Sequence, residues 1–132
     1  MIMNLHVSCI LVNWNGWQNT IECLDALKIS NYPDMAVIVV DNGSTNDSVA
    51  KIRAAHPLVT LLESGKNLGF AGGNNIGIRY ALADGAEYVW LLNNDTVPDP
   101  DALSTLVAKA STDRKIGAVA SICYYADSPS QV

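Results

Sequence analysis

The sequence predicts an α/β fold in which helices cover both faces of a mostly parallel sheet. Short apolar runs alternate along the chain with segments whose apolar residues recur every three or four positions. Runs that are apolar throughout suit strands buried on both faces, and their alternation with helical patterns implies crossover connections. The 132 residues, of which 49% are hydrophobic and 16% charged, suffice for one domain with its own core.

Five apolar runs predict the strands of this sheet. The predicted strands are residues 7–12, 36–40, 59–62, 88–92 and 116–122. Each of the first four is followed by a polar loop and a helical pattern, as in repeated β-α-β units. We therefore expect one domain over residues 1–125, followed by a frayed polar tail at residues 126–132.

Four helical patterns lie between the predicted strands. The apolar stripe of the first consists of Trp17, Ile21, Leu24 and Leu27. Ser44 is expected to cap the second helix, with Asp47 three residues later completing a capping box. The third helix opens in the glycine-rich segment 67–73 and runs to about residue 83. Asp99 is expected to cap the fourth, with Pro100 at its first helical position.

Charge and hydropathy exclude several classes of partner. The net charge is -5 and the eight Lys and Arg residues form no run, so neither nucleic-acid binding nor a polybasic membrane patch is expected. No apolar run reaches the roughly 18 residues that span a bilayer. The first residues lack a basic leader and a cleavage site. The sequence thus predicts a cytoplasmic protein without a transmembrane segment.

Polar loops follow each of the first four predicted strands, at the edge of the sheet where ligands bind in open α/β folds. Asp41 comes directly after an all-apolar strand. Its carboxylate can accept a hydrogen bond from the imide N–H of uracil or thymine, or it can serve as a turn or capping residue. Local sequence leaves both interpretations open.

The glycine-rich segment 67–75 (NLGFAGGNN) precedes a predicted helix. Glycine allows close backbone approach, and a helix N-terminus attracts phosphate. The segment is neither GxGxxG nor a GxxxxGK[ST] loop, and it follows the third strand rather than the first. These departures disfavour a nicotinamide dehydrogenase. A tight strand-to-helix connection is the alternative interpretation.

The triplet Asn93-Asn94-Asp95 ends the fourth predicted strand with oxygen-bearing side chains. Residues 93 and 95 would lie on the same side if the strand persists. Because Mg²⁺ and Mn²⁺ prefer oxygen ligands, Asp95 can supply a carboxylate and a bound diphosphate the remaining ligands.

Together these loops resemble family 2 glycosyltransferases with the GT-A fold, especially the rhamnosyltransferase-like members. The matching stretches are VSCILVNWNG, VIVVDNGSTNDS, NLGFAGGNNIGI and YVWLLNNDTVPDPDAL, over roughly residues 7–120. The resemblance implies inverting transfer of a sugar from a nucleotide-diphosphate sugar, of the UDP or dTDP type, to a hydroxyl of a saccharide or lipid-linked acceptor. It also implies Mg²⁺ or Mn²⁺ as cofactor and a role in cell-surface polysaccharide biosynthesis.

The resemblance assigns donor binding to nine positions. The nucleotide-sugar-binding residues would be Val12, Asn13, Asn15, Asp41, Asn67, Gly72, Asn93 and Asn94, and the metal ligand would be Asp95. Asn93 departs from the DxD motif of the family because it is neutral. Metal binding is therefore expected to require the bound nucleotide.

The family's catalytic base, a carboxylate in the acceptor half, has no convincing counterpart after Asp95 and is expected beyond residue 132. The chain is thus expected to be an N-terminal fragment that is inactive alone. Surface exposed by truncation predicts a homo-oligomer, and peripheral contact of the full-length protein with the inner membrane surface is an alternative to a purely cytoplasmic location.

Two other functions stay open from the sequence. One is a nucleotidyltransferase that makes sugar nucleotides, although the loop after the first strand (NWNG) lacks the basic residues that handle a triphosphate. The other is a non-catalytic nucleotide-binding or assembly fragment.

Overall fold

The computed structural model describes residues 5–132 and contains one four-stranded parallel sheet in the order β3-β2-β1-β4. The strands are β1 (Val7–Asn13), β2 (Met35–Asp41), β3 (Thr60–Glu63) and β4 (Tyr88–Leu91). The helices are α1 (Trp17–Leu27), α2 (Ser48–Ala55), α3 (Gly69–Ala83) and α4 (Ala102–Ala110). The predicted α/β class and parallel sheet are confirmed. None of the helices in residues 5–132 has the length and apolar character needed to cross a bilayer.

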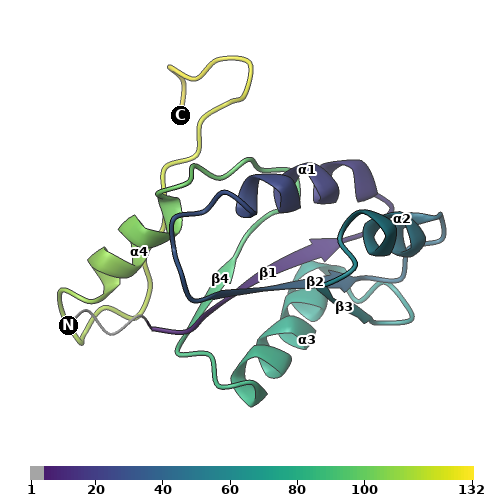
Figure 1. The fold of residues 1–132 in the computed structure, drawn as a ribbon, viewed down its shortest axis with the longest axis horizontal. Coiled ribbons are helices and arrows are strands. Elements are labelled where there is room, and N and C mark those ends of the chain that lie inside the picture. Colours follow the sequence, from purple (N-terminus) through teal and green to yellow (C-terminus); the bar gives the residue numbers. More distant parts are fainter. Residues whose placement is uncertain (1–4) are drawn as a thin grey trace.

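Each face of the sheet carries its own core, because successive side chains of a strand point to opposite faces. In Figure 1, α1 and α2 lie on one side of the sheet and α3 on the other. The core under α1 and α2 comprises Cys9, Leu11, Cys23, Leu24, Leu27, Val39 and Ile52. The core under α3 comprises Ile10, Ile38, Val40 and Ala81. Burial on both faces explains why β1 and β2 are mostly apolar.

The central pair of strands sets the position of the polar loops. β1 and β2 run parallel and in register from Val7 opposite Met35 to Asn13 opposite Asp41. Both strands therefore end at the same level, and β3 and β4 run in the same direction beside them. The loops after all four strands thus lie along one edge, which we call the rim.

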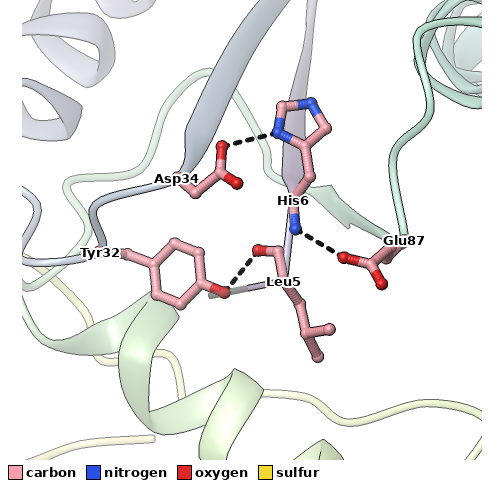
Figure 2. Close-up of polar contacts among 5 residues, drawn as sticks. All are labelled: Leu5, His6, Tyr32, Asp34 and Glu87. Atoms are coloured by element: carbon pink, nitrogen blue, oxygen red, sulfur yellow. Dashed lines mark hydrogen bonds and ion pairs between the residues drawn. The ribbon is translucent and has the colours of Figure 1, made fainter. Parts of the chain in front are cut away.

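Polar contacts hold the opposite, amino end of β1 (Figure 2). The His6 ring nitrogen Nδ1 lies 2.8 Å from Asp34 Oδ1, just before β2. The backbone N–H of His6 donates to Glu87 Oε2 at 3.0 Å, just before β4. The Tyr32 hydroxyl donates to the carbonyl oxygen of Leu5 at 2.6 Å. His6 thus helps fasten β1 to the segments leading into its two neighbours.

The predicted fifth strand at residues 116–122 is wrong. These residues form extended coil and pair with no strand among the residues that the structure describes. A strand requires a hydrogen-bonding neighbour, but here the segment is separated from β4 by a cavity of about 470 Å³. Residues of β4, α4 and the coil line that cavity. The tail after residue 125 projects away from the helices and the sheet in Figure 1, where it is yellow.

Two helix starts differ from the sequence prediction. The second helix begins at Ser48 with Asp47 as N-cap, so Ser44 does not cap it. Ser44 instead donates two hydrogen bonds to the Asp41 carboxylate, one from its hydroxyl and one from its backbone N–H. The hydroxyl is therefore engaged by Asp41 and not by the start of the helix. The fourth helix begins at Ala102, after Asp101. The Asp99 side chain accepts a hydrogen bond from the N–H of Asp101 in the turn before the helix.

α3 packs unusually close to β1 because Gly77 faces the sheet. A Cβ atom built on Gly77 would lie 2.5 Å from Ile10 Cγ2, well inside van der Waals contact. Ile10 itself is fully buried between the sheet and the helix. The absence of a side chain at residue 77 therefore sets the distance between α3 and β1.

Replacing Gly77 with Ala should destabilise the fold although alanine is the better helix former. The steric cost of about 1–3 kcal/mol for overpacking exceeds the gain of about 1 kcal/mol in helix propensity. Urea unfolding measures the loss. Gly117→Ala is the control, because nothing lies within 4 Å of the added methyl group, and it should change stability by less than about 0.5 kcal/mol. A Gly77→Ala chain as stable as the wild type would contradict this packing.

His56 is a buried histidine at the end of α2. It is 8% exposed, and its Nε2 lies 3.2 Å from Asp25 Oδ1 of α1, in a geometry that makes no hydrogen bond. Burial, and secondly the positive charge of Lys28, lower the pKa of His56, and the opposing effect of Asp25 does not offset them. The fold therefore favours the neutral imidazole.

Acidification should destabilise the chain through His56. Because the pKa of His56 is lower in the folded chain than the unfolded value near 6.5, the unfolded chain binds the proton first. The contribution to stability is complete above about pH 6.5 and is lost as the pH falls through the folded-state pKa. His56→Gln should flatten the pH dependence of the free energy of unfolding below neutrality. His6→Gln, which leaves this pocket intact, should retain it; equal slopes in wild type and His56→Gln would refute the account.

Candidate functional site

The rim is organised around the nearly buried carboxylate of Asp41, the last residue of β2, which is 3% exposed. Its Oδ1 accepts hydrogen bonds from Asn13 Nδ2 at 2.8 Å and from the Ser44 hydroxyl at 2.6 Å. Its Oδ2 accepts from the backbone N–H of Ser44 at 2.9 Å. A carboxylate offers about four lone-pair sites, so one acceptor position on Oδ2 remains for a further donor.

Asn13 joins the ends of β1 and β2. Its side chain is fully buried, and its Oδ1 accepts a hydrogen bond from the Thr20 hydroxyl at 2.8 Å. The same hydroxyl accepts from Asn94 Nδ2 at 2.9 Å. The loop after β1, the first turns of α1 and the loop after β4 are therefore connected by side-chain hydrogen bonds. Val12 precedes Asn13 and is partly buried beside Gly73 of α3.

Asn15 fastens the loop after β1 to the loop after β2. It has a φ of 56°, in the left-handed region that asparagine tolerates better than most residues. Its Oδ1 accepts from the backbone N–H of Thr45 at 2.8 Å and that of Asn46 at 3.3 Å. Its own N–H donates to the Ser44 hydroxyl. In this structure Asn15 thus holds the loop after β2 in place.

The start of α3 is fastened to the same loop by Asn42. Asn42 Nδ2 donates to Asn67 Oδ1 at 3.2 Å and to the carbonyl oxygen of Gly69 at 3.0 Å, and its Oδ1 accepts from the N–H of Leu68. Asn67 is exposed at the rim. Gly72 lies one turn into α3, where a Cβ would meet the Leu68 side chain. The glycine-rich segment therefore forms a tight connection and places a helix N-terminus at the rim.

The triplet after β4 forms a turn and does not continue the strand, which ends at Leu91. The carbonyl oxygen of Asn93 accepts from the N–H and the hydroxyl of Thr96, at 3.2 and 2.7 Å. It also lies 3.9 Å from the Cys23 thiol, which donates to it. Burial raises the pKa of Cys23 to about 11. A hydrogen bond with Thr96 acts in the opposite direction and lowers the pKa, whereas the negative charge of nearby Asp95 raises it further. The expected alternation that would align residues 93 and 95 therefore does not apply.

Asp95 is exposed on this turn, and the partly buried Asn94 lies between it and the exposed Asn93. In the part of the chain that the structure describes, no three acidic, histidine or cysteine residues are grouped to hold a metal ion. One carboxylate next to two amides fits a hard divalent cation only if another ligand supplies the remaining oxygens. A nucleotide diphosphate is a ligand of that kind.

Three of the four acidic residues after Asp95 take part in local structure. Asp99 accepts from the N–H of Asp101, Asp101 accepts from Asn31 Nδ2, and Asp113 accepts from the N–H of Lys115. The Asp101 contact and a backbone hydrogen bond from Asn31 to Pro100 attach the start of α4 to the end of α1. These three carboxylates stabilise turns and contacts between elements.

Sequence reasoning missed three residues of the rim: Thr20, Asn42 and Ser44. Thr20 is buried on the same face of α1 as Cys23, Leu24 and Leu27. A polar residue on an otherwise apolar helical stripe is a signal that could have found it, because a buried hydroxyl requires a partner. Asn42 and Ser44 look like ordinary turn residues in the sequence.

Residues 8–131 match the sequence model of a protein family, glycosyl transferase family 2. The chain belongs to this family. Membership decides between the two enzyme classes left open by the sequence in favour of the glycosyltransferase, and it confirms the resemblance inferred from the four loops.

Two curated relatives agree with this assignment. The chain is 37% identical over 111 residues to the galactofuranosyltransferase GlfT1 of Mycobacterium tuberculosis, covering 82% of this chain and 36% of that protein. It is 34% identical over 98 residues to the dTDP-rhamnosyl transferase RfbF of Shigella flexneri, covering 71% and 31%. The chain thus spans about a third of the length of these family members.

The mannosyltransferase PcManGT from Pyrobaculum calidifontis, solved in complex with GDP-Man and Mn²⁺, is a structural relative. It matches with a TM-score of 0.79 and 27% identity, over 88% of this chain and 35% of that one. The GT-A fold expected from the sequence is thereby confirmed.

Proposed function

We propose that the chain is the donor-binding part of a glycosyltransferase that takes a nucleotide-diphosphate sugar together with Mg²⁺ or Mn²⁺. The observation that carries the proposal is the rim itself, where side-chain hydrogen bonds connect the carboxylate at the end of β2 to the polar turn after β4. Such an arrangement provides separate places for the nucleobase and for a metal-bound diphosphate on one edge of the sheet.

The nucleobase and ribose would lie against Val12 and Asp41, and the fully buried Asn13 would act on this subsite through its hydrogen bond to Asp41. The remaining acceptor position on Asp41 Oδ2 suits an imide N–H of uracil or thymine, which supports a UDP or dTDP donor. Asn15 would shape this subsite by holding residues 44–46. Trp14, which is 56% exposed and follows Asn13 in the sequence, would supply an aromatic face to this subsite.

The diphosphate would lie between the start of α3 and the turn after β4. Asn67 and Gly72 border the N-terminus of α3, where backbone N–H groups and the helix dipole favour an anion. Asn93 and Asn94 would contribute amide groups from the other side, and Asp95 would hold the metal. A bound metal would neutralise charge that develops on the leaving diphosphate.

The reaction we propose is a direct displacement with inversion. The oxygen of an acceptor hydroxyl, on a saccharide or a lipid-linked sugar, forms a bond to the anomeric carbon while the bond to the diphosphate oxygen breaks. The hydroxyl proton passes to a carboxylate base. Asp99, Asp101 and Asp113 accept hydrogen bonds within the chain, so we do not propose any of these three as the base. Cell-surface polysaccharide synthesis at the cytoplasmic side of a membrane is the setting we propose.

Calorimetry with UDP, dTDP and GDP, each with Mn²⁺ or with EDTA, tests donor binding. We expect measurable binding of UDP or dTDP that is tighter with Mn²⁺, and Asp95→Asn should abolish the effect of Mn²⁺ because the single carboxylate is lost. Asp99→Asn is the matched control, since it neutralises a nearby acid that serves a turn, and it should retain the Mn²⁺ effect. Binding of none of the three nucleotides by the wild-type chain would refute the proposal.

We further propose that copies of the chain associate through the surface beside β4. The outer edge of β4 is unpaired among residues 5–132, and largely apolar side chains line the adjoining cavity. Light scattering should give a mass above 14.1 kDa, and Leu91→Lys, at a half-exposed position on β4, should reduce it. A monomer for the wild-type chain at all concentrations tested would refute this expectation.

A further inference from the structure

Four polar side chains form one hydrogen-bonded series across the interior of the rim. Asn94 Nδ2 donates to the Thr20 hydroxyl at 2.9 Å, the Thr20 hydroxyl donates to Asn13 Oδ1 at 2.8 Å, and Asn13 Nδ2 donates to Asp41 Oδ1 at 2.8 Å. Asn13 and Thr20 are fully buried. We call these four residues the relay.

The relay has a direction, which the carboxylate at its end determines. A carboxylate only accepts hydrogen bonds, so the amide of Asn13 must turn its NH₂ group toward Asp41 and its oxygen toward Thr20. The Thr20 hydroxyl has one proton, which it gives to that oxygen, and its lone pairs then face Asn94. Each donor thus points toward Asp41, and such a series strengthens its members by mutual polarisation.

The direction of the relay decides how Asn94 lies. Because the Thr20 lone pairs accept a hydrogen bond, Asn94 must present its NH₂ group to Thr20 rather than its oxygen. The amide oxygen of Asn94 therefore takes no part in the hydrogen bond with Thr20. An oxygen is the group that a cation next to Asp95 requires.

The hydrogen bond from Thr20 to Asn13 is not needed to satisfy the hydroxyl within α1. Its hydroxyl lies 3.2 Å from the carbonyl oxygen of Gly16, one turn earlier, and such local bonds commonly satisfy threonine in helices. The shorter bond nevertheless goes to Asn13. The backbone of the turn after β4 is held by Thr96 and Cys23, whereas the side chain of Asn94 is held by Thr20.

We propose that Thr20 is a positioning residue that orients Asn94, and with it the metal side of the donor site, according to the charge at Asp41. This inference rests on the proposed function. It goes beyond it by linking the nucleobase subsite to the metal subsite through a residue of α1 that touches neither ligand.

The test compares Thr20→Val, which keeps the shape and removes the hydroxyl, with Thr20→Ser, which restores a hydroxyl. The measured quantity is the ratio of nucleotide dissociation constants in EDTA and in Mn²⁺, using whichever of UDP and dTDP the wild type binds. Thr20→Val should reduce this ratio about five-fold, the equivalent of one hydrogen bond, and Thr20→Ser should restore it. Ser48→Ala is the matched control, because Ser48 also has a fully buried hydroxyl but no hydrogen-bond partner among the described residues.

A structural role alone would lower the stability of Thr20→Val and leave the ratio unchanged, and that result would overturn the proposal. A second measurement uses the ligand-free wild type and does not depend on the folding of a variant. The side-chain NH₂ protons of Asn94 should exchange with solvent more slowly than those of exposed Asn93, as measured by NMR. Equal rates would also overturn the proposal. If the wild type binds no nucleotide, the proposed function fails, while the Asn94 exchange rates in the wild type and in Thr20→Val still decide whether Thr20 holds Asn94.

Discussion

A carboxylate at the end of a buried strand imposes a strict requirement on everything around it, because a charge that leaves water must regain its hydrogen bonds inside the protein. Asp41 meets this requirement with donors from two directions, the Asn13 amide of the neighbouring strand and the hydroxyl and N–H of Ser44 in its own loop. The loop after β2 must therefore fold back over its strand. That conformation in turn places Ser44 where Asn15 can bind it.

The connections made by the other rim residues extend this arrangement to the whole edge of the sheet. Hydrogen bonds of Asn42 connect the loop after β2 to the start of α3, and a hydrogen bond of Thr20 connects α1 to the turn after β4. Four loops that are far apart in the sequence are thus interdependent, whereas the two apolar cores beneath them are separate. The rigidity of the rim comes from polar contacts, and the rigidity of the sheet comes from packing. The rim side chains thus hold one another in place, which is the preorganisation that the proposed polar ligand would require.

The sequence was sufficient for the strands and helices that contain strong apolar patterns and for the edge on which the polar loops lie. It failed where a residue had two competing partners. Ser44 has the composition of a helix cap but binds Asp41, a choice that depends on how β2 ends. Residues 116–122 have the composition of a strand, but strand formation depends on a neighbouring edge that they do not reach.

The role of Thr20 could not be assigned from local pattern alone, since its two side-chain partners lie 7 and 74 residues away in the chain. Family resemblance pointed to some residues of the rim, such as Asn13 and Asp41, without revealing how they are connected. The connections are a matter of donor and acceptor geometry in three dimensions, and a motif records only which residues occur. For the same reason the roles of Asn15 and Asn42 in holding loops became visible only with the fold.

The two ends of β1 are fixed by different chemistry, with His6 near Asp34 at one end and Asn13 bonded to Asp41 at the other. Sliding β1 by one residue along β2 would bring the wrong side chains to both ends at once and turn its apolar residues toward the opposite core. A mispaired sheet would therefore lose polar contacts at two distant points as well as its packing. The contacts at the two ends of β1 therefore form together only in the native register. A chain in which the rim has formed correctly has also paired β1 and β2 in the correct register.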